Sequence, residues 1–134
     1  ATRRSVTRVR KIYLFQPPGK TAPFLDFMDS LDGKAQKKVL FALKKMVIST
    51  GKLSEPQVKH FSIERYRKFY ELRERIRVLV RIIFTIDEAG NIILLHPFIK
   101  RHQRNTYQAL EISLGMLEQI KQSPDTLVEY HFPD

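Results

Sequence analysis

The segment from His96 to Asn105 concentrates side chains that can bind phosphate. Within five residues it carries four cationic or titratable side chains: Lys100, Arg101, His102 and Arg104. We expect this segment to leave a strand and enter a helix, and the first turn of a helix presents free N–H groups that also favour an anion. The segment is therefore a candidate phosphate-binding site. The alternative is a solvated loop.

A second charged group lies upstream, in segments whose residue types predict strands. Alternation places Glu71 and Arg73 on one face of the first strand, and Arg81 on one face of the next. The opposite face of that next strand is uniformly apolar and is the expected core face: Val78, Val80, Ile82 and Phe84. Arg81 is then either a solvated charge or one of the side chains that line a functional surface.

The sequence lacks the familiar catalytic signatures. It has no Walker loop, no GxSxG and no HExxH motif. Among the four histidines only His96 and His102 approach metal-ligand spacing, and the basic residues around them would repel a cation. Cysteine is absent, so disulfides and thiolate metal sites are excluded. We expect neither a metal ion nor another cofactor.

Charge indicates the class of partner. Lys and Arg number 24 against 14 Asp and Glu, a formal net charge of +10. Such a surface attracts polyanions, so nucleic acid is the leading partner and an acidic protein the next. A membrane surface is disfavoured, because no helix pairs a basic face with a wide aromatic one. We expect a cytoplasmic protein, since no secretory signal is recognisable. A basic protein that is merely soluble is the alternative.

Residue periodicity predicts one domain over residues 1–134 with an α+β fold. The expected elements are a strand over 10–15, a helix capped by Thr21 with Pro23 in its first turn, a helix over 34–49, strands over 69–74, 77–86 and 92–98, and a helix from a cap at Asn105 or Thr106 to about 122. The buried stripe expected for the last helix is Leu110, Leu114 and Leu117, flanked by Ile120.

The expected architecture is thus an N-terminal strand, a helical hairpin, an antiparallel meander sheet and a C-terminal helix, in the order β-α-α-β-β-β-α. A turn at 87–91 would join the last two strands of the meander. We expect the hairpin and the sheet to form two layers. The tail at 126–132 would add an edge strand or lie disordered.

Three runs in this order resemble the RelE/ParE superfamily of toxins, and most closely its phage Gp49-like, HigB-type branch: residues 70–73 (YELR), 80–84 (VRIIF) and 94–101 (LLHPFIKR). The resemblance covers about 11–122 and leaves the basic N-terminal arm and the tail at 123–134 outside. Residues 74–77 replace a glycine turn that the family often has, and Pro97 replaces a glycine that commonly follows the histidine.

The resemblance implies the toxin of a type II toxin-antitoxin system, which cleaves messenger RNA in the ribosomal A site without a metal ion. In such relatives the ribose 2′-hydroxyl attacks the phosphate. Arg73, Arg81 and Arg101 match the family's basic positions and would stabilise the phosphate charge. The resemblance also implies a cognate acidic antitoxin of the helix-turn-helix kind, in a toxin-antitoxin hetero-oligomer.

Protons could be carried by Glu71, His96 or His102. We favour His102, because the neighbouring cations favour its neutral form. RNA-binding roles would fall to four further positions: Lys100, Arg104, Tyr107 and His96. Tyr107 could stack on a base, or could only pack the start of the helix.

Two other functions fit the same fold. ParE-type members inhibit DNA gyrase by protein contact, and a third possibility is a non-catalytic module that binds RNA or protein. The density of basic and proton-carrying residues on one face favours RNA.

Overall fold

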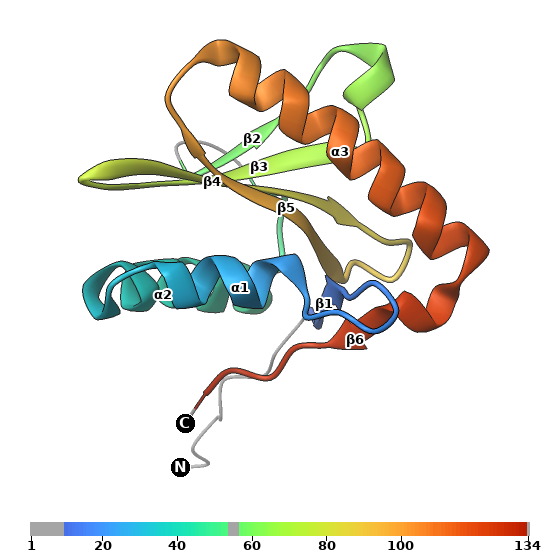
Figure 1. The fold of residues 1–134 in the computed structure, drawn as a ribbon, viewed down its shortest axis with the longest axis horizontal. Helices are drawn as coiled ribbons and strands as arrows, with labels where there is room; N and C mark the ends of the chain where they lie inside the picture. The colour runs from blue at the N-terminus through green and yellow to red at the C-terminus, as the bar shows by residue number, and fades with distance from the viewer. Residues whose placement is uncertain (1–9, 54–56, 134) are drawn as a thin grey trace.

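The computed structural model describes residues 10–53 and 57–133, which form three α-helices and one six-stranded sheet (Figure 1). In chain order the elements are β1 (Ile12–Phe15), α1 (Pro23–Ser30), α2 (Gly33–Ile48), β2 (Val58–His60), the 3-10 turn η1 (Glu64–Tyr66), β3 (Phe69–Ile76), β4 (Val78–Ile86), β5 (Ile92–Lys100), α3 (Gln103–Gln122), the 3-10 turn η2 (Pro124–Thr126) and β6 (Leu127–Glu129). The mixed α+β class is confirmed. Strand β2 was not predicted, and β6 is the edge-strand alternative for the tail.

The sheet has the strand order β2-β3-β4-β5-β1-β6. Strands β3, β4 and β5 form the predicted antiparallel meander. The turn between β4 and β5 closes with a hydrogen bond from the Asp87 amide to the Asn91 carbonyl at 2.9 Å. Strand β1 runs parallel to β5, and β6 pairs antiparallel with the free side of β1. The N-terminal strand therefore lies inside the sheet rather than at its edge.

Helices cover both faces of the sheet (Figure 1). The fold therefore has three layers rather than the two that we expected. The apolar face of β4 packs as predicted against the helical hairpin α1/α2: Val80, Ile82 and Phe84 share one core with Val39 and Leu43. The opposite face is buried too, because Phe69, Ile83 and Leu95 pack against Leu110 of α3. Val78 was expected in the core, but it lies at the hairpin tip and is 41% exposed.

Two helices begin differently from the expectation. Ala22, not Thr21, is the N-cap of α1, and its first turn has no side-chain cap. The start of α3 lies earlier than expected, at Gln103, with His102 as N-cap. Asn105 does stabilise this start, but from inside the helix, where its Oδ1 accepts the amides of Arg101 and His102 at 2.9 and 2.8 Å. Helix α2 begins after Asp32, whose carboxylate accepts the Ala35 amide at 2.8 Å.

The buried stripe of α3 is only partly the predicted one. Leu110 is fully buried, whereas Leu114, Leu117 and Ile120 are partly buried against the same core. The other buried residues of α3 are Thr106, Ala109, Ser113 and Met116. Within residues 10–53 and 57–133, no helix is both long and apolar enough to cross a membrane.

Candidate phosphate-binding site

A row of side chains crosses the meander on the face that also carries α3. Arg73 of β3 lies directly opposite Arg81 of β4, and Arg81 lies opposite Phe98 of β5. We call Arg73 and Arg81 the arginine pair. Cross-strand neighbours of this kind have Cβ atoms about 5 Å apart, so two cations placed opposite each other repel. A counter-charge is therefore needed to hold them together.

Glu71 supplies that charge. Its side chain is only 2% exposed, and its Oε1 lies 3.3 Å from the Nε of Arg73 and 3.7 Å from the Nε of Arg81. The second oxygen, Oε2, is buried without a hydrogen-bond partner among the described residues. Since buried polar atoms are almost always paired, an unpaired carboxylate oxygen here is an unusual feature. One buried anion thus positions two guanidinium groups.

Burial also acts on Arg81 itself. Its side chain is 13% exposed, against 30% for Arg73. This burial, together with repulsion from Arg73 and Arg75, lowers the pKa of Arg81, while attraction from Glu71 partly compensates. Arg81 is therefore a cation largely removed from water. Such a cation attracts a phosphate oxygen more strongly than a fully hydrated one would.

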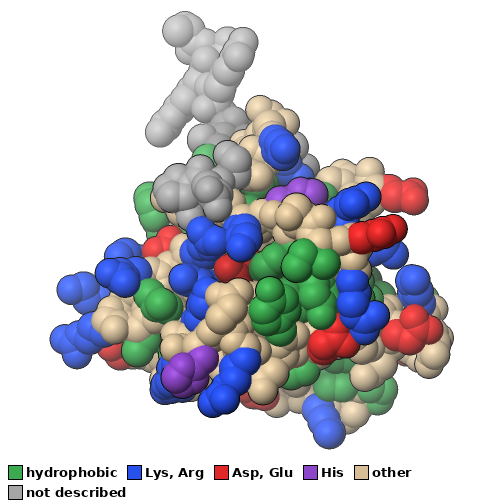
Figure 2. All heavy atoms as spheres, turned by 90° about the horizontal axis from the view of Figure 1, so that it is seen from above, with side chains coloured by type: hydrophobic (Ala, Val, Ile, Leu, Met, Phe, Trp, Pro, Cys, Tyr) green, Lys and Arg blue, Asp and Glu red, His purple; other side chains and the backbone are tan. Residues whose placement is uncertain are grey.

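The arginine pair lines a hollow of about 310 Å³, which we call the pair hollow; its walls are Gln57, Arg73, Glu74, Arg75, Leu79 and Arg81. A second hollow, of about 560 Å³, lies at the β3–β4 hairpin, and we call it the hairpin hollow. Its lining includes Lys100 and Arg101 from the end of β5 together with Arg75 and Leu79, which both hollows share. Figure 2 shows many of the Lys and Arg side chains gathered on this side, next to a patch of hydrophobic side chains.

His96 occupies an irregularity in β5. The pairing of β4 with β5 shifts between Ile82, opposite Pro97, and Phe84, opposite Leu94, so β5 carries one extra residue here. Such bulges redirect side chains. The His96 ring stacks on Phe98 with centroids 6.2 Å apart, and it also lines a separate hollow with Lys20 and Asp26. Burial lowers the pKa of His96, so the ring is neutral at pH 7.

The remaining candidates lie at the start of α3. His102, Arg104 and Tyr107 are all exposed. The ring of Tyr107 is 44% exposed and lies 6.4 Å from that of Tyr66, which leaves part of it open to solvent. The Tyr107 ring thus packs near Tyr66 and also exposes part of its surface to solvent.

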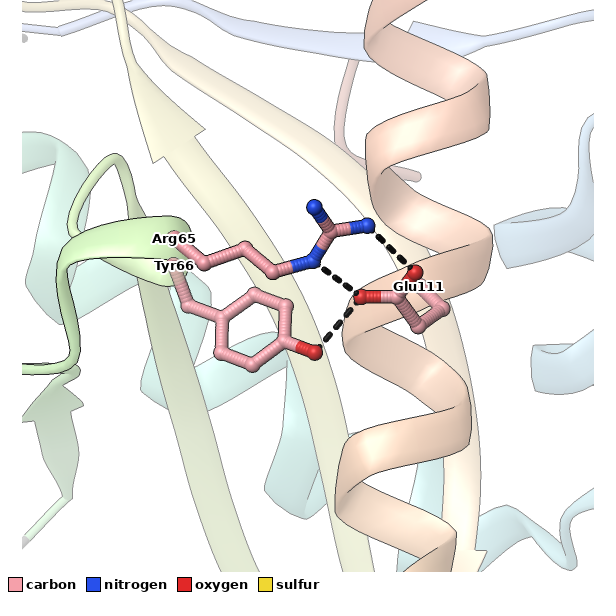
Figure 3. Close-up of polar contacts among 3 residues, drawn as sticks. All are labelled: Arg65, Tyr66 and Glu111. Carbon is pink, nitrogen blue, oxygen red and sulfur yellow. Dashed lines mark hydrogen bonds and ion pairs between the residues drawn. The ribbon is translucent and has the colours of Figure 1, made fainter.

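Three polar contacts, which we call the clasp, fix η1 to α3 (Figure 3). Arg65 donates two hydrogen bonds to Glu111 at 2.8 and 2.7 Å, and the hydroxyl of Tyr66 donates a third at 2.5 Å. Hydrogen bonds from Arg65 and Tyr66 lower the pKa of Glu111 to about 2, and the bond to Glu111 raises the pKa of Tyr66. The clasp holds the Tyr66 ring in place against Tyr107.

The structure thus brings the predicted residues together in two groups. Glu71, Arg73 and Arg81 touch one another, while Lys100 and Arg101 line the adjoining hollow. Four predicted residues lie outside both hollow linings: His96, His102, Arg104 and Tyr107. The sequence analysis did not propose Arg75 or Arg77 as site residues, although arginines alternate at positions 73, 75 and 77, with Arg77 in the turn between β3 and β4. The basic N-terminal arm at 1–9 lies outside the described residues.

No group of three or more His, Asp or Glu residues that could hold a metal ion occurs in the part of the chain that the structure describes. The described residues of the two hollows offer clustered guanidinium groups with a buried carboxylate. Such a set can bind a phosphodiester and stabilise added negative charge on it.

Comparison with known families gives one match. A family model described as "Phage derived protein Gp49-like (DUF891)" matches residues 26–116, which include the helical hairpin, the meander and most of α3. No curated protein matches the chain.

Proposed function

The chain belongs to the Gp49-like family of phage-derived proteins, in the RelE/HigB-like toxin branch, and on this premise we propose that it is the toxin of a type II toxin-antitoxin system that cuts messenger RNA on the ribosome. The observation that carries the proposal is the arginine pair held by Glu71, with 13% and 30% of the two guanidinium-bearing side chains exposed to a hollow. A solvated surface charge would need no buried counter-ion.

The proposed reaction uses the RNA's own 2′-hydroxyl. Its oxygen forms a bond to phosphorus while the bond from phosphorus to the 5′ oxygen breaks, which leaves a 2′,3′-cyclic phosphate and a free 5′-hydroxyl. The pentacoordinate phosphorane carries extra negative charge, and the arginine pair stabilises it with Arg101 from the loop. His102 accepts the 2′ proton and returns a proton to the leaving oxygen. No metal ion takes part in this scheme.

We assign Glu71 a positioning role rather than a proton-carrying one. Its Oε1 already neutralises two arginines, and the side chain is buried. Its two ion pairs fix the carboxylate between the arginines, which suits a residue that holds them in place. His96 is neutral at pH 7 but faces a different hollow, so its proposed contribution is to RNA contact beside Phe98.

The test is to map RNA ends after induced expression of the wild-type protein and of Arg81→Lys. Lysine keeps the charge but lacks the planar fork, so cleavage should fall sharply. Lys37→Gln is the matched control, since it removes an exposed cation from α2, which covers the opposite face of the sheet. Cut fragments should end in a cyclic phosphate or 3′-phosphate, and a 2′-deoxy sugar at the cut should block the reaction.

Intact messenger RNA together with inhibited DNA supercoiling would instead identify a ParE-type gyrase inhibitor. Cleavage of the 2′-deoxy substrate at the normal rate, leaving a 3′-hydroxyl, would indicate a nuclease that activates water and would refute the scheme.

A cognate acidic antitoxin is part of the proposal. The net charge of +10 favours a partner of opposite sign that covers the basic face. Co-expression of a neighbouring gene for a small acidic protein should restore growth, and the two proteins should copurify. Failure of both would mean that the toxin has no such partner.

A further inference from the structure

The hairpin hollow is lined by cations and contains no carboxylate. Four of its lining side chains are positively charged: Arg75, Arg77, Lys100 and Arg101. Among residues 10–53 and 57–133, no ion pair joins any of these four to an acidic residue. This differs from the neighbouring arginine pair, which Glu71 partly neutralises. The hairpin hollow therefore holds concentrated positive charge that the fold leaves uncompensated.

The backbone at the hairpin tip is strained. Arg77 has φ +61°, in the left-handed region, and it is the one described residue other than glycine with a positive φ. Glycine would adopt this conformation at no steric cost, whereas an arginine there is disfavoured. Local strain of this kind is characteristic of functional sites. Within the fold, the described contacts give the Arg77 side chain no partner that would account for an arginine at this position.

The two hollows adjoin each other. Arg75 and Leu79 line both, and Leu79 pairs with Arg75 on one side and with Lys100 on the other. Residues two apart on one strand face are separated by about 7 Å, so Arg75 lies one such step from Arg73. A polyanion whose charges repeat along a chain can therefore occupy both hollows at once.

We propose that Arg75, Arg77 and Lys100 form a second phosphate subsite, which binds a backbone phosphate adjacent to the one held by the arginine pair in a single-stranded RNA. The choice of RNA rests on the proposed function. Continuity with the pair hollow and the guanidinium forks, which match phosphate oxygens, favour RNA over an acidic peptide. In this arrangement the hairpin subsite supplies affinity and the arginine pair supplies chemistry.

The test measures binding without cleavage. The probe is a fluorescein-labelled eight-nucleotide RNA with 2′-O-methyl groups throughout, and its anisotropy is titrated with protein at several salt concentrations. Arg75→Gln and Arg77→Gly should each weaken binding about tenfold and reduce the salt dependence by about 0.7 in the log–log slope, the value for one lost contact to a single strand. Lys37→Gln should change neither quantity by more than twofold.

Arg77→Gly separates binding from folding, because glycine relieves the strain at the tip. Its unfolding temperature should equal or exceed that of the wild-type protein while its RNA affinity falls. Unchanged affinity in both variants would overturn the subsite. An equal loss in Lys37→Gln would overturn it too, since net charge alone would then explain binding, and so would equal competition by a poly-glutamate peptide of matched charge.

Cleavage of ribosome-bound messenger by the wild-type protein is scored separately. A protein that binds the probe in the expected pattern but cuts no RNA would refute the nuclease and support the subsite.

Discussion

Replacing Glu71 with glutamine should lower both the stability of the sheet and the rate of RNA cleavage. The substitution preserves shape but removes the buried negative charge that pairs with both Arg73 and Arg81. Removing one partner of a fully buried ion pair costs about 3–5 kcal/mol. Because the two arginines are 30% and 13% exposed and can recruit water, we expect roughly half of that, about 2 kcal/mol. With an unfolding entropy of about 0.28 kcal/mol per degree for 134 residues, the melting temperature should fall by about 7 °C.

RNA affinity and cleavage should change in opposite directions. Loss of an anion makes the surface more positive, so the uncleavable RNA should bind as tightly as before or more tightly. The guanidinium groups, no longer held together, should move apart, and a misplacement of about 1 Å can lower the rate about 100-fold. The assays are thermal unfolding by circular dichroism and single-turnover cleavage at saturating protein, with Glu88→Gln in the exposed turn as control. Wild-type cleavage in a destabilised Glu71→Gln protein would refute the positioning role.

Three further predictions concern the histidines and the clasp. His102→Asn should abolish cleavage while leaving thermal stability unchanged or higher, because asparagine is a strong N-cap for α3; retained cleavage would assign the proton transfer elsewhere. Burial lowers the pKa of His96, so the wild-type protein should lose stability as the pH falls below the 6.5 of an exposed histidine. In urea titrations between pH 7 and 5, His96→Asn should lose less stability than the wild-type protein. An equal loss of unfolding free energy with pH in both proteins would contradict this prediction. The clasp lowers the pKa of Glu111 to about 2, so the stability that the clasp contributes is complete above pH 4.5 and is lost as the pH falls toward 2. The difference in unfolding midpoint between the wild-type protein and Glu111→Gln should therefore narrow from pH 5 to pH 3. A constant difference would contradict the lowered pKa.

The sequence predicted the helices and the meander because their periodic apolar residues and turn residues act locally. Asp32 and Gly33 separate the two helices of the hairpin, and residues 87–91 form the turn, as expected. Strand β2 has only three residues with Lys59 in the middle, which leaves no apolar alternation to detect. The early start of α3 was missed because Asn105 acts from the third helical position rather than as the cap itself.

We predicted two layers and the structure has three, because the central strands are buried on both faces. Alternation assigned one core face to β4, yet residues 82–86 are nearly all buried because α3 covers the other face. A continuous run of apolar residues is typical of a strand buried on both faces, and that run was visible in the sequence. The predicted grouping of Glu71, Arg73 and Arg81 on one face agrees with the structure. The burial of Glu71 depends on contacts across strands and with neighbouring elements, which one strand's sequence does not specify.

The place of β1 between β5 and β6 has a consequence for the timing of folding. Contacts of β1 with the β4–β5 turn join residues 80 positions apart, such as the Lys11 amide and Asn91. At about 5–20 residues per second, a ribosome needs roughly 4–16 s to make the intervening chain, and β6 comes later still. Until then the β3–β4 hairpin has neither α3 over it nor a completed sheet beside it, and an isolated hairpin is marginally stable. The arginine pair therefore gains its full packing only after nearly all of the described chain has been synthesised, and under the proposed function this delays the completed site relative to the ribosome that makes the protein.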